Sequence, residues 1–260
     1  MVENRVNATD TINPIVLDWD SRHFGFAVAK ANWSGEGSDL QRLINWAVDK
    51  QVTLLYLFAP TSVVLPTWTT QRCVGVFVSE RVEFEKAVGS NRDADFGAEV
   101  AIMELTAENC QLDSVTRLGV LAGRYSRFSR DPRIPQGKAQ KLFEIWAEKS
   151  VRRELADTVF GAFRADGDLI GFVTLKQDGL IGRIGLLTVV PERRSMGCGR
   201  ALVCATETWA AARKLTTLRV VTQADNEAAC GFYRRVGFHE CERQVVFHLW
   251  LREPSNGTRH

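Results

Sequence analysis

The carboxy-terminal third of the chain alternates short apolar runs with polar turns. Apolar, β-branched runs at residues 157–164 and 169–176 flank Asp166-Gly167, a dipeptide typical of a tight hairpin. A third run at 180–190 follows after another short turn. The pattern predicts three consecutive antiparallel strands.

Downstream of these strands the apolar residues recur at helical spacing. Leu202, Ala205 and Trp209 follow one another at intervals of three and four residues, which predicts a helix over 198–213. The next predicted elements are a strand, a helix capped by Asn226 and closed by Gly237, and a last strand, at 217–222, 226–236 and 243–251. Upstream, the apolar residues Leu142, Phe143, Trp146 and Val151 predict a helix that begins near residue 137.

Part of this order occurs twice. Residues 46–57 align without gaps on 209–220, and residues 74–85 align on 236–247. Two matches in the same order and at nearly equal separation favour a degenerate duplication of a helix–strand–helix–strand unit. We therefore predict an amino-terminal domain over 1–108, a carboxy-terminal domain over 109–252 and a disordered tail over 253–260.

Composition narrows the class of protein. Of 260 residues, 45% are hydrophobic, and 33 Lys and Arg oppose 31 Asp and Glu, for a formal charge of +2. This balance provides no field for capturing nucleic acid or an anionic membrane. Neither a signal-peptide pattern nor an apolar run long enough for a membrane helix is evident, and the six cysteines have no metal-ligand spacing. We expect a cytoplasmic enzyme without a metal.

The segment VVPERRSMGCGRAL, residues 189–202, carries the most informative motif. Arg194, Gly197 and Gly199 stand at R-x-x-G-x-G spacing between a predicted strand and a predicted helix. Such a turn directs free backbone N–H groups and the positive end of the helix dipole outward, which suits a pyrophosphate. Glycines at these positions let a ligand approach the backbone, and the loop matches neither a dinucleotide-binding nor a Walker pattern.

These residues resemble the signature of the GNAT acyltransferases, which bind acetyl-CoA at such a turn. The pattern V-x-P-x-x-R-x-x-G-x-G-x-x-L runs here from Val189 to Leu202, and a second family motif follows with Asn226, Phe232-Tyr233 and Gly237-Phe238. The resemblance implies an α/β (α+β) GNAT fold, a mixed central sheet flanked by helices. The duplication then implies a tandem GNAT, with a truncated GNAT-like domain over 1–108 and a catalytic domain over 109–252.

A narrower resemblance covers about two thirds of the chain. Residues 17–26, 126–135, 183–190 and 216–233 are similar to the dTDP-fucosamine (dTDP-4-amino-4,6-dideoxygalactose) acetyltransferases. This implies transfer of an acetyl group from acetyl-CoA to the amine of a dTDP-linked amino-dideoxy sugar, as in lipopolysaccharide biosynthesis. The family resemblance leaves open a protein, polyamine or antibiotic amine as acceptor, a non-catalytic acyl-CoA-binding module, and a homodimer.

The resemblance also assigns roles to residues. The backbone of Leu187, Thr188 and Val189 would pair with the pantetheine arm, and one of these N–H groups would polarise the thioester carbonyl. The pyrophosphate would lie on the loop that follows, with Asn226 near the thiol end; the loop residues are Arg194, Met196, Gly197, Cys198, Gly199 and Arg200. In the amino-terminal copy, residues 31–40 lack the arginine of this loop, so only the second half is expected to bind coenzyme.

Tyr233 is the candidate catalytic residue. It lies two helical turns after Asn226 on the same face, and its hydroxyl could protonate the departing thiolate. We expect Phe232 rather than Tyr233 to be the aromatic packed into the core. His239, Glu240 and Asp131 are possible bases, and none is preferred on sequence alone.

An aromatic and two arginines between the predicted domains suit a nucleotide sugar. Tyr125 could stack on a base, and Arg127 and Arg133 could bind a diphosphate. The alternative is a structural loop. The expected partners are thus acetyl-CoA and a dTDP-amino sugar.

Overall fold

The computed structural model describes residues 13–89 and 100–252, so the predicted tail over 253–260 lies outside the described residues. The chain forms two compact units. Unit 1 comprises residues up to Arg81, Arg130–Ile134 and residues from Arg243 on, whereas unit 2 comprises Val82–Ser129 and Pro135–Glu242. Unit 1 is discontinuous because β4 (Cys73–Ala87) and β10 (His239–Leu251) each contribute one end to each unit, and unit 2 is interrupted by the segment Arg130–Ile134.

Unit 1 is a small sheet covered by one long helix. Besides the ends of β4 and β10 it contains β1 (Ile15–Val16), α1 (Asp18–Phe24), β2 (Val28–Asn32), α2 (Gly37–Asp49), β3 (Leu54–Ala59) and the 3-10 turn η1 (Thr67–Gln71). Its strand order is β1-β2-β3-β10-β4. Strand β3 is parallel to β2 and antiparallel to β10, and α2 buries Leu40, Leu43 and Ile44 in the core of the unit.

A buried carboxylate fastens the segment Arg130–Ile134 into unit 1. Asp131 is 2% exposed, and its Oδ2 lies 2.6 Å from Nδ1 of the fully buried His248. The same oxygen accepts a 2.9 Å hydrogen bond from Trp250 Nε1, while Oδ1 accepts one from the Arg133 amide. Asp131 is therefore inaccessible as a base and acts as a structural clasp.

Replacing Asp131 by Ala is expected to destabilise the protein by about 3 kcal/mol, because two buried N–H donors lose their acceptor. Urea unfolding measures the effect, and Asp49→Ala, which removes an exposed carboxylate at the end of α2 in the same unit, is the control. Equal unfolding midpoints for the two variants would contradict the clasp.

The clasp also predicts a pH dependence of stability. Burial favours the neutral carboxyl, but the hydrogen bonds from His248, Arg133 and Trp250 outweigh it and lower the pKa of Asp131. A carboxyl whose pKa is lower in the folded state stabilises the fold above its unfolded pKa, about 4, and loses that contribution as the pH falls through the folded value. The difference between wild type and Asp131→Ala should shrink below about pH 4.

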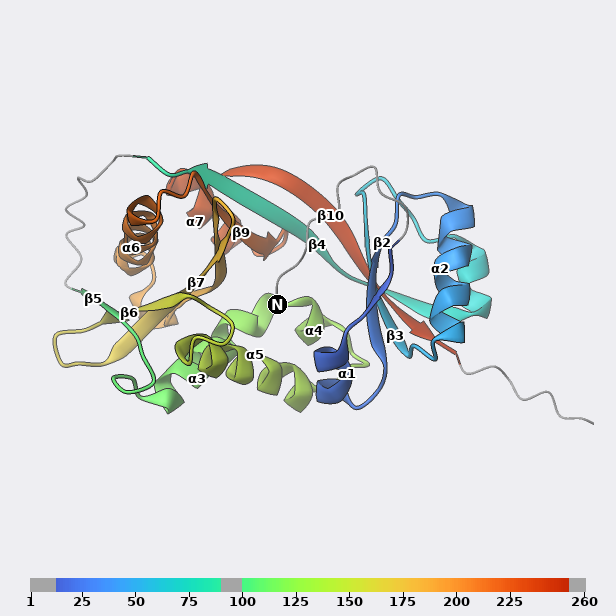
Figure 1. Ribbon diagram of the computed structural model, residues 1–260, viewed down its shortest axis with the longest axis horizontal. Coiled ribbons are helices and arrows are strands. Elements are labelled where there is room, and N and C mark those ends of the chain that lie inside the picture. Colours follow the sequence, from blue (N-terminus) through green and yellow to red (C-terminus); the bar gives the residue numbers. More distant parts are fainter. Residues whose placement is uncertain (1–12, 90–99, 253–260) are drawn as a thin grey trace, which may run out of the picture. The chain divides into compact units, whose positions relative to one another are not determined.

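Unit 2 has a larger sheet with helices on both faces. Its own elements are β5 (Ala101–Glu104), α3 (Leu112–Ala122), η2 (Gly123–Tyr125), α4 (Arg127–Arg130, which ends in the Arg130–Ile134 segment of unit 1), α5 (Gln136–Val151), β6 (Thr158–Phe163), β7 (Leu169–Asp178), β8 (Ile181–Val189), η3 (Pro191–Arg193), α6 (Cys198–Ala212), β9 (Thr217–Gln223) and α7 (Glu227–Arg235). Helices α3 and α5 lie on one side of the strands, and α6 and α7 lie on the other (Figure 1). The strand order is β10-β4-β9-β8-β7-β6-β5.

The predicted elements of the last third of the chain are present with small shifts at their ends. Strands β6 to β8 form the expected antiparallel meander, and Gly167 takes the left-handed conformation, φ 89°, in the first hairpin turn. The last strand begins at His239, four residues earlier than predicted. The predicted loop before α5 also contains the short helix α4.

The two halves of the chain differ in one predicted element. The duplication predicts a helix between β3 and β4, but the structure has only the 3-10 turn η1 there. Pro60 and Pro66 bracket the segment before this turn, and proline lacks the N–H that a helix interior requires.

The compact units do not coincide with the linear domains 1–108 and 109–252. The strand β3, from the first half, pairs with residues 245–250 of β10, and β4 enters unit 2 beside β9. Each unit thus takes a strand end from the other half of the sequence. The linear domains, as units of duplication, stay a prediction.

Candidate active site

Strands β8 and β9 separate halfway along their length. They pair in parallel from Ile181–Thr217 to Ile184–Val220, and beyond this point β8 pairs only with β7. The backbone of Leu187, Thr188 and Val189 therefore faces β9 without sheet pairing on that side. This is the opening at which a strand-like ligand could add to β8.

A β-bulge explains why the strands separate. The pairing of β7 with β8 shifts between Val173–Leu187 and Leu175–Ile184, so β8 has one extra residue. The amide of Leu186, which this shift removes from the ladder, donates a 2.8 Å hydrogen bond to Thr174 Oγ1. The bulge bends β8 away from β9 and reverses which of its side chains face each helix layer.

The turn after β8 has the conformation that the glycine motif predicts. Gly197 is the N-cap of α6 with φ 82°, so no side chain caps the first turn of the helix. Ser195, two residues earlier, also has a positive φ of 62°. The first N–H groups of any helix lack intrahelical acceptors, and here the exposed Met196 precedes them in the turn. The arrangement suits an anion.

Arg194 connects the turn to the end of β8. Its Nε donates a 3.2 Å hydrogen bond to the carbonyl of Val189, the last residue of β8. The motif arginine therefore links the strand to the turn. Its side chain is exposed.

Gly199 is required for a second reason besides the approach of a ligand. A Cβ at this position would lie 3.1 Å from the ring of Phe232 on α7. The glycine allows α6 and α7 to pack closely. Arg200 is exposed on the same helical turn, whereas Cys198 is buried in the core.

Asn226 caps α7 as predicted. Its Oδ1 accepts a 3.3 Å hydrogen bond from the amide of Ala229, and its Nδ2 lies 3.5 Å from Thr222 Oγ1 on β9. Thr222 belongs to the part of β9 that has separated from β8. The residue therefore stands beside the opening.

The expectation about the two aromatics of α7 is wrong. Tyr233 is the buried one, at 5% exposure, whereas Phe232 is only partly buried because it packs across Gly199. The ring of Tyr233 contacts the rings of Phe84 and Phe238. Burial, followed by the charge of Cys230, raises the pKa of the Tyr233 hydroxyl, so the group keeps its proton.

The candidate substrate residues are divided between the units. Tyr125 is 41% exposed in unit 2, where the guanidinium of Arg127 also lies 4.4 Å from the ring of Phe128. Arg133 belongs to unit 1 and lies over the Trp250 ring at 5.9 Å. In each unit an arginine stacks on an aromatic side chain.

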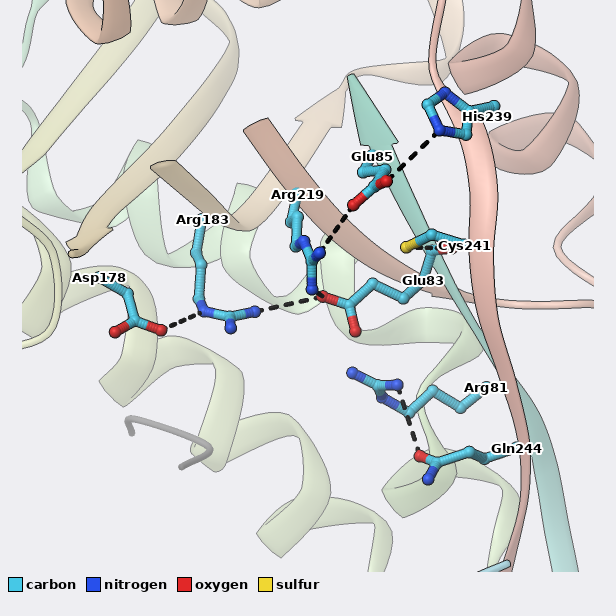
Figure 2. Close-up of polar contacts among 9 residues, drawn as sticks. All are labelled: Arg81, Glu83, Glu85, Asp178, Arg183, Arg219, His239, Cys241 and Gln244. Atoms are coloured by element: carbon cyan, nitrogen blue, oxygen red, sulfur yellow. Dashed lines mark hydrogen bonds and ion pairs between the residues drawn. The ribbon is translucent and has the colours of Figure 1, made fainter. Parts of the chain in front are cut away.

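A row of charged side chains on the sheet of unit 2 was not predicted from the sequence. Glu83 of β4, Arg183 of β8 and Arg219 of β9 meet on one face, as Figure 2 shows. The sequence does contain a signal, because each of these residues alternates along its strand with apolar residues that face the core. Their convergence depends on strand order, which the sequence did not provide.

Comparisons with known proteins fit this geometry. The profile of the Acetyltransferase (GNAT) family matches residues 125–238, which include the opening, the glycine turn and Tyr233. An aminoglycoside N(6')-acetyltransferase type 1 from Stenotrophomonas maltophilia is 32% identical over 45% of this chain and 87% of its own length. The chain belongs to the GNAT acetyltransferase family.

Two further similarities extend beyond the segment that matches the family. It is 31% identical to a dTDP-fucosamine acetyltransferase from Escherichia coli over 60% of this chain, and the match spans 64% of that protein's length. A tandem GNAT protein from the clavulanic acid biosynthesis pathway superposes with a TM-score of 0.55 at 12% identity, over 88% of this chain and 76% of the other. The predicted family and the predicted tandem GNAT fold are thereby confirmed. Among the helices within 13–89 and 100–252, none has the length and apolar character to cross a bilayer.

Proposed function

We propose that this GNAT protein transfers an acetyl group from acetyl-CoA to a primary amine. The observation that carries the proposal is the opening between β8 and β9, with the glycine-capped start of α6 at its end. An extended pantetheine could pair with Leu187, Thr188 and Val189, while the N–H groups from Met196 to Arg200 hold the pyrophosphate.

One coenzyme per chain is expected from the contrast between the two halves. Strand β2 pairs with β3 along its whole length, from Val28–Leu54 to Asn32–Phe58, so unit 1 has no comparable opening among its described strands. Asn32, the last residue of β2, also stands where the motif would require an arginine before the turn to α2. Acetyl-CoA should therefore bind to unit 2 alone.

The chemistry requires few groups. When the amine attacks the thioester, negative charge develops on the carbonyl oxygen, and an N–H of the unpaired β8 backbone could stabilise it. The departing sulfur then takes a proton. We assign Tyr233 as the general acid, because it has the place of the family motif on α7, seven residues after Asn226, and its hydroxyl keeps its proton until the thiolate forms.

For the acceptor we propose a dTDP-linked amino-dideoxy sugar, with 4-amino-4,6-dideoxygalactose as the first candidate. Support comes from the dTDP-fucosamine acetyltransferase relative and from the exposed Tyr125 and the neighbouring Arg127. The aminoglycoside relative keeps an aminoglycoside as the second candidate. The two differ in charge, because a diphosphate is anionic and an aminoglycoside is polycationic.

Free dTDP is expected to compete with the acceptor and not with acetyl-CoA. Arg127→Ala should raise the KM for the dTDP-sugar about tenfold and leave the KM for acetyl-CoA within about twofold, because a lost charge-assisted hydrogen bond is worth about 1.5–3 kcal/mol. Arg124→Ala is the matched control, because Arg124 is exposed on the 3-10 turn η2 that precedes Arg127. Efficient turnover of an aminoglycoside without inhibition by millimolar dTDP would instead favour the second candidate.

A further inference from the structure

The charged row of unit 2 lies on the face of the sheet opposite to Tyr233. The alternate residues Phe84, Ile184 and Leu218 pack into the core beneath α6 and α7. Because successive side chains of a strand point to opposite faces, Glu83, Arg183 and Arg219 project from the other face. Figure 2 shows these side chains together on one side of the strands.

Within this row, Glu83 is paired with one arginine from each of the strands that separate, β8 and β9. Its Oε1 lies 3.2 Å from Nη1 of Arg183 on β8 and 3.8 Å from Nη1 of Arg219 on β9. These two arginines are register partners, one position before the last pair of the β8–β9 ladder. The guanidinium groups of the two arginines thus connect β8 and β9 to a carboxylate of β4, one register position before the last pair of the ladder.

Glu83 itself is 3% exposed, but residues that follow the arginines on β8 and β9 are exposed. Gly185 has no side chain and is exposed, and Val221 is 38% exposed. A thioester in the opening would be reachable from this face. The coenzyme turn and Tyr233 are associated with the other helix layer, so an amine can approach from the side of Glu83 without meeting them.

The row contains further carboxylates. Besides Glu83 it contains Glu85, whose Oε2 lies 2.7 Å from Arg219 Nη2, and Asp178, whose Oδ2 lies 2.9 Å from Arg183 Nε. Three carboxylates and two guanidinium groups of unit 2 lie in this row, and Arg81 precedes Glu83 by two residues on β4. His239 Nε2 stands 3.4 Å from Glu85 Oε1 at the outer end of the row.

The thiol of Cys241 lies next to these carboxylates. Cys241 Sγ lies 3.5 Å from the backbone oxygen of Glu83. Burial raises the pKa of this thiol to about 12, and the charges of Glu85, Glu83 and Glu242 add to the effect. Carboxylates thus lie close to this thiol, and an amine acceptor arrives at neutral pH as an ammonium ion.

We propose that the Glu83 carboxylate binds the ammonium of the acceptor and takes its proton, with Arg183 and Arg219 as positioning residues. The proposal rests on the acetyl transfer proposed above. The proton moves from nitrogen to Glu83, directly or through one water, and the freed lone pair attacks the carbonyl carbon. The C–N bond forms, the C–S bond breaks, and Tyr233 protonates the sulfur. The second proton of the nitrogen passes, directly or through water, to the Tyr233 phenolate and restores its hydroxyl, and the proton on Glu83 leaves to solvent.

The assignment gives the amino-terminal half of the chain a part in the reaction. Glu83 lies outside the segment 125–238 that matches the GNAT profile, because β4 enters unit 2 from the first half. A carboxy-terminal segment alone would contain the coenzyme turn and Tyr233 but not this carboxylate.

The test is a pH profile of Glu83→Gln with acetyl-CoA and the dTDP-4-amino sugar. At pH 7 we expect kcat/KM for the acceptor to fall about 10²–10³-fold, the usual contribution of a general base. The loss should shrink as the pH rises and the amine loses its proton without help. The Kd of this variant for acetyl-CoA should stay within threefold of the wild-type value. The control is Glu80→Gln, on the same strand as Glu83, which breaks an exposed ion pair with Arg243 of β10; its kcat/KM should stay within threefold of wild type at every pH.

A second variant controls for misfolding caused by the change in net charge at this site. The double variant Glu83→Gln/Arg183→Gln removes one charge of each sign, so the face retains its charge balance, and the same pH-dependent loss is expected. A folded Glu83 variant as active as wild type at pH 7, or a loss that is equal at all pH values, overturns the assignment. A wild-type protein that acetylates no amine overturns the proposed function and this proposal with it, whereas an active wild type beside an unaffected Glu83→Gln overturns this proposal alone.

Discussion

Replacing Tyr233 by Phe is expected to lower kcat about 10²–10⁴-fold, the range that a lost general acid explains. The ring would remain against Phe84 and Phe238, so only the hydroxyl is removed. Because burial raises the pKa of this hydroxyl, it stays protonated over the working range, and the loss should be the same at pH 7 and pH 9. Steady-state kinetics at saturating acetyl-CoA measure the effect.

Tyr56→Phe is the matched control for this prediction. It removes the same atom from a buried tyrosine of unit 1, whose ring lies 4.8 Å from that of His248. We expect the control to keep kcat even if its unfolding midpoint moves. A Tyr233→Phe protein within a fewfold of wild type would assign the proton to water or to another residue.

Replacing Gly197 by Val is expected to weaken acetyl-CoA binding by about 100-fold or more, equivalent to about 2.7 kcal/mol. The residue has φ 82°, which a β-branched side chain rarely adopts, and it is the N-cap of α6. The turn would therefore distort, and its N–H groups would no longer converge on a pyrophosphate. Isothermal titration with acetyl-CoA measures the change.

Gly167→Val separates this effect from backbone strain. Gly167 has a similar φ of 89° in the turn between β6 and β7, and a Cβ there would meet nothing within 4 Å. Both variants are strained to a similar degree, but only Gly197→Val should lose affinity. Equal affinities in two folded proteins would show that the α6 turn is structural.

The coenzyme side of the candidate site was predictable because its determinants are local. The run of strand, turn and helix from Ile181 to Ala212 lies within a single stretch of sequence, and the glycine positions identify the turn between them. Asn226 likewise caps a helix that begins with the next residue. Periodicity and capping chemistry are sufficient for such elements.

The acceptor side depends on contacts that no local pattern encodes. Glu83 and Arg183 are 100 positions apart, and Asp131 and His248 are 117 apart. The first pair exists because β4 enters the sheet of unit 2 beside β9. Strand order of this kind is set by the packing of the whole chain, and the duplication seen in the sequence did not predict that the two halves exchange strand ends.

The burial of Tyr233 was missed for a similar reason. Phe232 and Tyr233 are adjacent on α7, and amino-acid type alone favours the phenylalanine as the core residue. In the structure α7 directs Tyr233 toward Phe84 of the sheet, whereas the Phe232 ring lies beside Gly199 of α6. The orientation of α7 on the sheet is a tertiary property that its own sequence does not give.

Product analysis tests the central claim most directly. The full chain is incubated with acetyl-CoA and dTDP-4-amino-4,6-dideoxygalactose, the released thiol is followed with a chromogenic disulfide, and the sugar nucleotide is examined by mass spectrometry. The account predicts one thiol released for each N-acetylated sugar nucleotide formed. No acetyl-CoA-dependent product from this sugar, an aminoglycoside or any other primary amine would contradict it.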